Sequence, residues 1–142
     1  MHTVAAILSR KARTSITVAP DMTVTEALQI MADQNIGSVV VMQGEEYKGI
    51  MTERDYSRKV VLKGKNSIST KVSEIMSTDL PVVKPNDTID FCMQLMTERN
   101  IRYMPVFENN KLTGIISMSD IVKETIIMQR ETISHLESYI RQ

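Results

Sequence analysis

Apolar and polar residues alternate along the chain in patterns that predict short helices and strands. In residues 24–31 the apolar side chains recur at spacings of three and four, which is typical of an amphipathic helix. The apolar run at residues 39–42 and the segment 48–51 flank the turn Gly44-Glu45 and predict a β-hairpin. A short leading helix over residues 4–8 and a brief strand over residues 16–19 are expected before these elements.

The same order of elements returns in the second half of the chain. When residue 20 is aligned with residue 85, the halves run without a gap to residues 55 and 120, and ten of the 36 aligned pairs are identical. Ordinary composition would give about two. Each repeat, of about 60 residues, reads strand–helix–strand–strand–helix and is too small to be stable alone, so we expect the two to bury apolar faces against each other. In the first copy the identical residues are Pro20, Thr23, Gln29, Met31, Asn35, Ile36, Val41, Gly49, Ile50 and Asp55.

Each repeat also contains a glycine, a short apolar run, a hydroxyl residue and, three residues later, an aspartate. The pattern predicts a buried strand followed by a helix, with Thr52 or Ser117 as the N-cap and Asp55 or Asp120 in the first turn. Such a junction directs free backbone N–H groups at one point, which suits a phosphate, and the aspartate is placed to accept hydrogen bonds from a ribose diol. A capping box without a ligand is the alternative for one copy, but its recurrence in the same frame favours binding.

Residues 120–142 contain no glycine or proline and predict one long helix. Its apolar positions form a heptad seam, which packs either on the protein's own body or against a second chain, and we favour a homodimer. The seam residues are Val122, Ile126, Gln129, Ile133, Leu136 and Ile140.

These elements predict an α+β fold with helices on one face of a small sheet. The predicted domain boundaries are a leading helix and first repeat at residues 1–63, a polar linker at 64–71, a second repeat at 72–128, and a helical extension at 129–142.

The composition argues against several classes of function. The 142 residues carry a net charge of +0, which gives no bias toward nucleic acid or an anionic membrane. No apolar run approaches a membrane span and no signal peptide is visible, so we expect a cytoplasmic protein. The single Cys92 lies on an apolar helix face and is expected in the core. His2, in a terminus expected to be mobile, and His135, beside the seam, suggest neither catalysis nor a metal site. We therefore predict no enzyme.

The duplicated repeat resembles the cystathionine-β-synthase (CBS) domain pair, or Bateman module. The resemblance rests on the proline that closes the early strand of each repeat, on the matched runs at residues 35–41 and 100–106, and on the glycine-to-aspartate motif. It covers about residues 3–128, and residues 52–60 are similar to small stand-alone bacterial members. It implies two β-α-β-β-α repeats packed with pseudo-twofold symmetry, followed by a long C-terminal helix.

The family implies a sensor. CBS pairs bind adenosine-containing ligands in two clefts between their repeats, so the resemblance implies a regulatory module for AMP, ATP or NAD, without a catalytic cofactor and with an unknown regulated protein. By matching position, Asp55 and Asp120 would hold the riboses, and Thr52 and Ser117 the first phosphate. The residues implied to contact adenine are Ile16, Thr17, Ile36, Gly37 and Ser38 in the first site, and Pro81, Val82, Ile101, Arg102, Tyr103 and Met104 in the second.

The two implied sites differ in charge. Arg54 and Arg58, four residues apart, are expected to share a helix face beside the first phosphate position, whereas Ser119 and Lys123 occupy the matching places in the second repeat. We expect the first site to prefer a longer phosphate or a dinucleotide, and the second to prefer AMP. The alternative function is a structural dimerisation module with vestigial clefts and no ligand.

Overall fold

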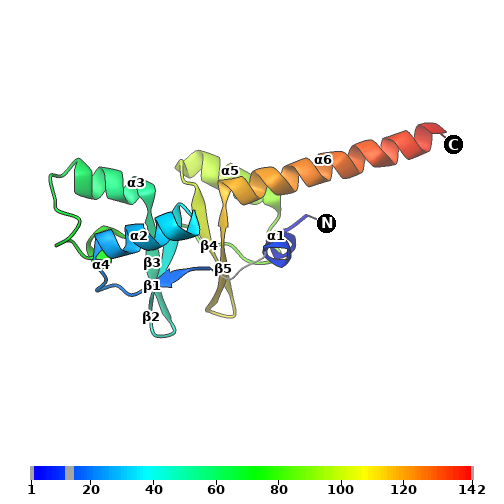
Figure 1. The fold of residues 1–142 in the computed structure, drawn as a ribbon. Coiled ribbons are helices and arrows are strands. Elements are labelled where there is room, and N and C mark those ends of the chain that lie inside the picture. Colours follow the sequence, from blue (N-terminus) through cyan, green and yellow to red (C-terminus); the bar gives the residue numbers. More distant parts are fainter. Residues whose placement is uncertain (1, 12–14, 142) are drawn as a thin grey trace. The chain divides into compact units, whose positions relative to one another are not determined.

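The computed structural model describes residues 2–11 and 15–141, and its elements follow the predicted order (Figure 1). Helices and strands are mixed along the chain, which confirms the α+β class. The elements are α1 (Val4–Arg10), β1 (Thr17–Val18), α2 (Val24–Gln34), β2 (Ser38–Gln43), β3 (Glu46–Thr52), α3 (Glu53–Tyr56), the π-helix η1 (Ser57–Val61), α4 (Val72–Ile75), α5 (Ile89–Arg99), β4 (Tyr103–Glu108), β5 (Lys111–Ser117) and α6 (Met118–Arg141).

The chain forms two compact units, and the short leading helices are exchanged between them. The first-repeat unit contains residues 15–80, and the second-repeat unit contains residues 2–11 and 81–141. The helix α1 therefore packs with the second repeat, and α4 packs with the first. The backbone bonds are equivalent: the N–H of Val4 donates to Asp87 C=O (2.9 Å), and the N–H of Val72 donates to Met22 C=O (2.8 Å). The predicted boundaries thus describe the sequence repeats, whereas each compact unit borrows the leading helix of the other repeat.

The first-repeat unit is built on a three-stranded sheet in the order β1-β2-β3. The strand β1 pairs parallel with β2, and β2 pairs antiparallel with β3. Thr23 is the N-cap of helix α2, and its hydroxyl oxygen accepts the N–H of Glu26 (3.2 Å). The C-cap is Asn35, which adopts the left-handed conformation (φ 54°) that asparagine tolerates at a helix C-terminus. The apolar face of α2 joins the buried core of this unit.

The second-repeat unit has a two-stranded sheet, β4-β5. The strand predicted before α5 is reduced to one parallel bridge between Val83 and Val106, so the prediction of a full strand there is wrong. The N–H of Val83 donates to the C=O of Pro105 (3.1 Å), and the C=O of Val83 accepts the N–H of Phe107 (2.9 Å). Two prolines, Pro81 and Pro85, flank this bridge, and because proline lacks an N–H donor the ladder cannot extend through them.

The motif glycines lie where the exchanged segments cross the hairpins. A β-carbon added at Gly49 would stand 2.6 Å from the backbone oxygen of Ser77, which pairs there with Ile50. A β-carbon added at Gly114 would stand 2.9 Å from a methyl group of Leu8, on α1. Another segment therefore packs directly on the strand at both positions, against a backbone oxygen at Gly49 and against the flexible end of a side chain at Gly114.

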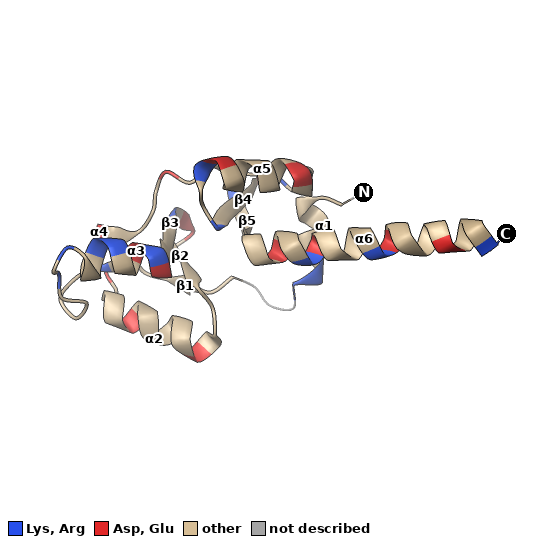
Figure 2. Cartoon of the chain, turned by 90° about the horizontal axis from the view of Figure 1, so that it is seen from above, with Lys and Arg blue, Asp and Glu red and all other residues tan. Residues whose placement is uncertain are grey.

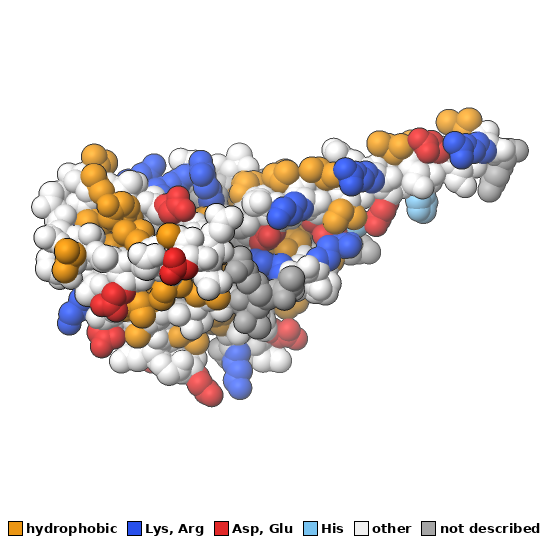
Figure 3. All heavy atoms as spheres, viewed as in Figure 1, with side chains coloured by type: hydrophobic (Ala, Val, Ile, Leu, Met, Phe, Trp, Pro, Cys, Tyr) orange, Lys and Arg blue, Asp and Glu red, His pale blue; other side chains and the backbone are white. Residues whose placement is uncertain are grey.

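Helix α6 confirms the prediction of one long C-terminal helix. One face packs on the second-repeat unit through the fully buried Ile121, the buried Glu124 and the partly buried Met128. From Gln129 onward every described residue of α6 is exposed. The seam residues lie on the face that points away from the core, where Figure 3 shows apolar side chains along the projecting helix. Within the described residues, the seam is therefore not covered by the protein's own body.

Candidate functional site

In the first repeat, the sheet gathers several of the predicted residues at the end of the hairpin where α3 begins. Ser38, the first residue of β2, lies opposite Thr52, the last residue of β3. The N–H of Glu53 donates to the C=O of Gly37 (3.2 Å), which joins the start of α3 to the residues before β2. Ile16 lies alongside, since its C=O accepts the N–H of Val40 (3.0 Å). Thr17 pairs with the same strand, and Ile36 directly precedes Gly37.

The second repeat repeats this arrangement. Tyr103 at the start of β4 lies opposite Ser117 at the end of β5, and the N–H of Met118 donates to the C=O of Arg102 (2.8 Å). Ile101 precedes this pair, Ser119 is exposed in the first turn of α6, and Pro81 and Val82 precede the single bridge at Val83. Met104 is 0% exposed in the core of the unit. Neither its side chain nor its backbone is therefore at a surface, and the residue contributes to the core and not to a ligand contact.

Asp55, the aspartate of the first repeat, is buried, and its carboxylate is fully used by its neighbours. Its Oδ2 accepts hydrogen bonds from the backbone N–H (3.0 Å) and the hydroxyl (3.1 Å) of Thr52. Its Oδ1 accepts the hydroxyl of Ser77 (2.8 Å) and pairs with the ammonium of Lys59 (2.9 Å). A carboxylate offers about four lone-pair positions, so a ligand that needs Asp55 as acceptor must displace one of these donors.

Asp120, the aspartate of the second repeat, is less occupied. Its Oδ2 accepts the N–H of Ser117 (2.9 Å) and the ammonium of Lys11 (3.0 Å), which also donates to the C=O of Ile115 (2.8 Å). Among the described residues no donor contacts Oδ1 of Asp120, and the side chain is 14% exposed, against 7% for Asp55. The Ser117 hydroxyl oxygen accepts the N–H of Asp120 (3.1 Å), which leaves its proton for another acceptor.

The basic segment after Thr52 differs from the prediction. Arg54 lies in α3, but Arg58 lies in the π-helix η1, where the N–H of Leu62 donates to the C=O of Ser57 (3.1 Å), five residues back. This wider turn changes the α-helical spacing on which the shared face of the two arginines was predicted. Figure 2 shows the basic residues of this segment in blue. The cation that meets the aspartate here is Lys59, whereas Arg58 is exposed.

Sequence reasoning missed the donors that surround the two aspartates. Lys59 had a visible signal, because it stands four residues after Asp55 in a predicted helix. No sequence signal indicated that Ser77 would contact Asp55 or that Lys11 would contact Asp120, because both residues belong to the exchanged segments. One hollow, of about 750 Å³, lies at the opposite end of the second hairpin from Ser117. Its lining residues are Val82, Lys84, Pro85, Asn86, Phe107, Glu108, Asn109 and Asn110.

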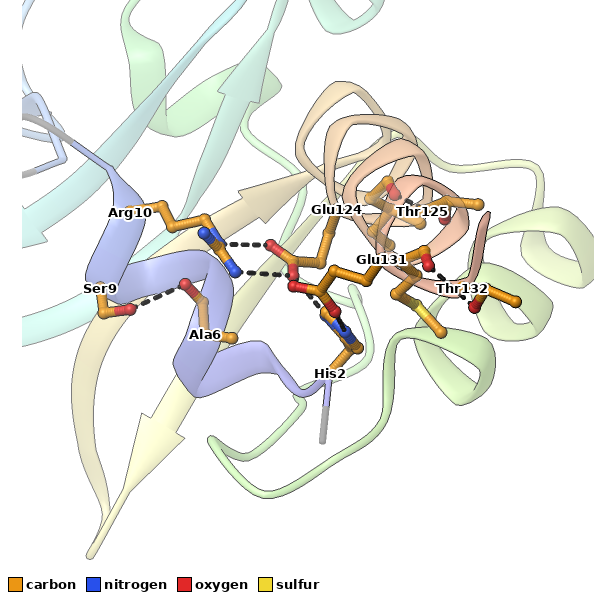
Figure 4. Close-up of polar contacts among 10 residues, drawn as sticks. His2, Ala6, Ser9, Arg10, Glu124, Thr125, Glu131 and Thr132 are labelled. Atoms are coloured by element: carbon orange, nitrogen blue, oxygen red, sulfur yellow. Dashed lines mark hydrogen bonds and ion pairs between the residues drawn. The ribbon is translucent and has the colours of Figure 1, made fainter. Parts of the chain in front are cut away.

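A charged cluster joins the N-terminal segment to α6 (Figure 4). His2, expected to be mobile, contacts Glu124 through Nδ1 (2.6 Å) and Glu131 through Nε2 (2.9 Å). Arg10 donates through Nε to Glu124 (2.9 Å), which is 2% exposed. Both ring nitrogens face carboxylates, which accept hydrogen bonds when ionised, so this geometry favours the doubly protonated imidazolium. The hydrogen bond to Glu124, followed by the contacts with Glu131, raises the pKa of His2 above its ordinary 6.5.

Other chemically reactive groups have ordinary structural roles. Cys92 is fully buried, as predicted, and burial together with the nearby Asp87 raises the pKa of its thiol to about 11. The thiol is therefore protonated and unreactive near neutral pH. No group of three or more histidine, cysteine or acidic residues within residues 2–11 and 15–141 is arranged to hold a metal ion. The described helices also include none that is long and apolar enough to cross a membrane.

Comparisons with known proteins agree with this architecture. The family profile described as "CBS domain" matches the chain twice, over residues 4–61 and 72–126. The chain therefore belongs to the CBS-domain family and contains two CBS repeats in tandem.

Three related proteins illustrate its range. A CBS-domain protein of Burkholderia ambifaria that has been assigned to signal transduction has a similar structure, with a TM-score of 0.84 and 44% identity, and the match covers 88% of this chain and 94% of that one. The mitochondrial CBS domain-containing protein CBSX3 of Arabidopsis thaliana is 38% identical over 126 residues, which are 85% of this chain but 61% of that protein. The hexameric CBS-CP12 protein of bloom-forming cyanobacteria gives a TM-score of 0.73 at 29% identity, covering 86% of this chain and 70% of that one.

Proposed function

We propose that this chain is a regulatory module that binds an adenine nucleotide, AMP, ATP or NAD, through the aspartate and the capping hydroxyl of its repeats. Membership of a family with regulatory and signal-transduction members supports the general role. The observation that carries the nucleotide proposal is the state of Asp120. This carboxylate is held in place by Ser117 and Lys11 and retains an oxygen that accepts no hydrogen bond from the described residues.

A ribose diol donates two hydroxyl protons, and an ionised carboxylate is the side chain best suited to accept them. Oδ1 of Asp120 meets this requirement without rearrangement. The Ser117 hydroxyl and the first backbone N–H groups of α6 lie beside it, at the positive end of a helix of 24 residues, where a phosphate is stabilised. Lys11 supplies a cation at the same place.

The first repeat carries the same groups in a closed arrangement. Asp55 would receive a ribose only after Lys59 or Ser77 had moved away. A released Lys59 would then join Arg54 and Arg58 as a cation for a phosphate chain, so we keep the proposal that this site favours ATP or NAD and the second favours AMP. The physical basis for this preference is now Lys59, and no longer a helix face shared by Arg54 and Arg58.

The regulatory output would be a change in arrangement. A nucleotide shifts an equilibrium between two arrangements only by the difference in its affinity for them. We propose a homodimer that associates through the exposed seam of α6, and an oligomeric CBS-domain neighbour, the hexameric CBS-CP12 protein, is consistent with self-association. A regulated partner protein, the cytoplasmic location and the absence of catalysis stay predictions.

A second function, a dimerisation module without a ligand, is favoured by one observation. The carboxylate of Asp55 already has a complete set of internal donors, as a vestigial site would. If both clefts were vestigial, the exposed seam of α6 would be the working surface.

Isothermal titration of nucleotide-stripped protein with AMP, ATP and NAD tests the proposal. Micromolar binding of at least one of them, together with a loss of at least tenfold for the 2′,3′-dideoxy analogue, is expected if an aspartate holds the diol. The exposed Asp90, in the first turn of α5, provides the matched control, because Asp90→Ala removes a carboxylate and should leave binding unchanged. Flat titrations with all three nucleotides, from folded protein, would favour the dimerisation module.

A further inference from the structure

Helix α6 has two opposite faces, one packed against the rest of its unit and one exposed. The face formed by Ile121, Glu124 and Glu131 is engaged by the second-repeat unit and by the N-terminal segment. The opposite face carries the heptad seam, whose apolar members are between 41% and 80% exposed: Val122, Ile126, Ile133, Leu136 and Ile140. Five large apolar side chains in one exposed line are costly in water and are typical of a surface that pairs with another helix.

The heptad positions identify what this surface fits. Ile126, Ile133 and Ile140 occupy one core position of the heptad, and Val122, Gln129 and Leu136 occupy the other. Isoleucine at every first position, with valine and leucine at two of the three second positions, gives the seam the apolar core of a coiled coil, and this core by itself sets no orientation. The apolar side chains of the seam have the size and spacing needed to pack against an identical seam. The partner that fits this surface is therefore α6 of a second copy of this chain.

The charges beside the seam indicate the orientation of the two copies. Lys123, Arg130 and Glu137 follow the second core position, and in a parallel pair they would face Met118, Thr125 and Thr132, which carry no charge. In an antiparallel pair centred near residue 131, Lys123 of each copy faces Glu137 of the other, which gives two ion pairs against one Arg130–Arg130 contact. The same register places Ile126 opposite Leu136 and Ile140 opposite Val122.

The position of the helix on its unit favours the same orientation. Residues 118–128 are held by tertiary packing, whereas residues 129–141 project as an isolated helical half of about 20 Å. An isolated helix of this length is marginal in water. In an antiparallel dimer each projecting half lies along the anchored half of the partner, whereas in a parallel dimer two unsupported halves would hold only each other.

We infer that two copies of this chain pair through α6 as an antiparallel coiled coil, with Lys123 of each copy against Glu137 of the other. The inference rests on the homodimer proposed above and adds its geometry. It gives each exposed apolar layer a partner from the opposite end of the second helix.

Disulfide trapping tests the orientation directly. Ile126→Cys and Leu136→Cys are made as separate variants, and the unsubstituted chain is the control because its only cysteine, Cys92, is 0% exposed. The antiparallel pair predicts a disulfide-linked dimer when the two variants are mixed, and none from either variant alone. Dimers that form from each variant alone would establish a parallel pair and overturn the inference.

Charge exchange gives a second, independent measurement by analytical ultracentrifugation. Lys123→Glu should raise the dimer dissociation constant about five- to tenfold at low salt, and Lys123→Glu with Glu137→Lys should restore it to within about twofold. Lys111→Glu, at the exposed start of β5, is the matched change of net charge and should have little effect. A dimer insensitive to Lys123→Glu would contradict the register, and a monomer at every concentration would instead remove the homodimer itself.

Discussion

The two repeats share one motif but surround its aspartate differently. In the first repeat, Asp55 has two donors on each oxygen, and in the second, Asp120 has two donors on one oxygen and none from the described residues on the other. Part of the difference follows from one repeat position. Four residues after the aspartate stands Lys59 in the first repeat and Glu124 in the second. A lysine there pairs with the aspartate of its own helix, whereas a glutamate cannot.

Glu124 instead recruits partners from the N-terminal segment. It binds Arg10 and His2, and these contacts hold α1 so that Lys11 reaches Asp120. The exchanged helices also differ in length. The helix α4 ends at Ile75, which leaves Ser77 extended and free to reach Asp55, whereas α1 continues to Arg10. Arg10, a better helix former than the matching Thr78, stands within α1, and Ser9 bonds within its own helix to Ala6 (2.9 Å). Equivalent sequence positions therefore acquire different chemistry through their exchanged neighbours.

The largest predicted contrast concerns the two motif glycines. Gly49→Ala should lower the free energy of unfolding by about 2–3 kcal/mol, because the new methyl group meets a backbone oxygen that is held in a bridge. Gly114→Ala should cost about 1 kcal/mol or less, because Leu8 offers a flexible side-chain end that moves. Urea unfolding of both variants measures the difference. Equal losses would show that the two crossings are equally rigid.

The next contrast is the structural cost of losing each aspartate. Asp55→Ala should destabilise the fold by about 2 kcal/mol, since it removes the acceptor for Thr52 and Ser77 in a buried place. Asp120→Ala should cost about 1 kcal/mol, because the site is more exposed and Lys11 keeps the carbonyl of Ile115. Thermal and denaturant unfolding give both values. A larger loss for Asp120→Ala would contradict the description of Asp55 as the structural member of the pair.

Removing the internal donors of Asp55 should make the first site resemble the second. Lys59→Met with Ser77→Ala removes both donors from Oδ1 of Asp55 and leaves that oxygen available, as in the second repeat. If the proposed function holds, this double variant should strengthen AMP binding at the first site by about three- to tenfold, the equivalent of about one hydrogen bond. Thr78→Ala, next to Ser77, is the matched control. Unchanged AMP binding by the double variant would mean that internal donors are not what closes the site.

The smallest contrast is a pH dependence of stability that we expect from His2, in the second-repeat unit. Because the pKa of His2 is raised in the folded protein, its contribution to stability is complete below about pH 6.5 and is lost as the pH rises through the folded value. The free energy of unfolding should therefore fall as the pH rises above about 6.5. His2→Ala and Glu124→Gln should each flatten this dependence, whereas the exposed His135→Ala should keep it. A slope that persists in His2→Ala would place the titration elsewhere.

Much of the fold was open to prediction from the sequence. The duplication, the hairpins, the caps at Thr23 and Thr88 and the long C-terminal helix all leave local signals in residue type and spacing. The shortened strand at Val83 was not predicted, because alignment with the first repeat outweighed the two flanking prolines. The exchange of α1 and α4 has no local signal, since both helices look alike in sequence and only tertiary contacts decide which core each one joins.

Some features of the candidate site were likewise predictable from the sequence, and others were not. The hairpin end that gathers Gly37, Ser38 and Thr52 follows from strand register, which the sequence pattern indicates. The occupation of Asp55 by Ser77, and of Asp120 by Lys11, depends on segments 22 and 109 residues away in the chain. The burial of Met104 agrees with its place in an apolar segment whose residues 104–106 are all buried, but the family resemblance outweighed this signal.

The most direct test of the central claim is a calorimetric titration with AMP of the unsubstituted chain, Asp55→Ala and Asp120→Ala. If Asp120 is the ribose acceptor that stands ready, Asp120→Ala should weaken the tightest AMP-binding event by at least tenfold, while Asp55→Ala should leave it within about threefold. The opposite ranking, with the tight event lost in Asp55→Ala and kept in Asp120→Ala, would contradict the account.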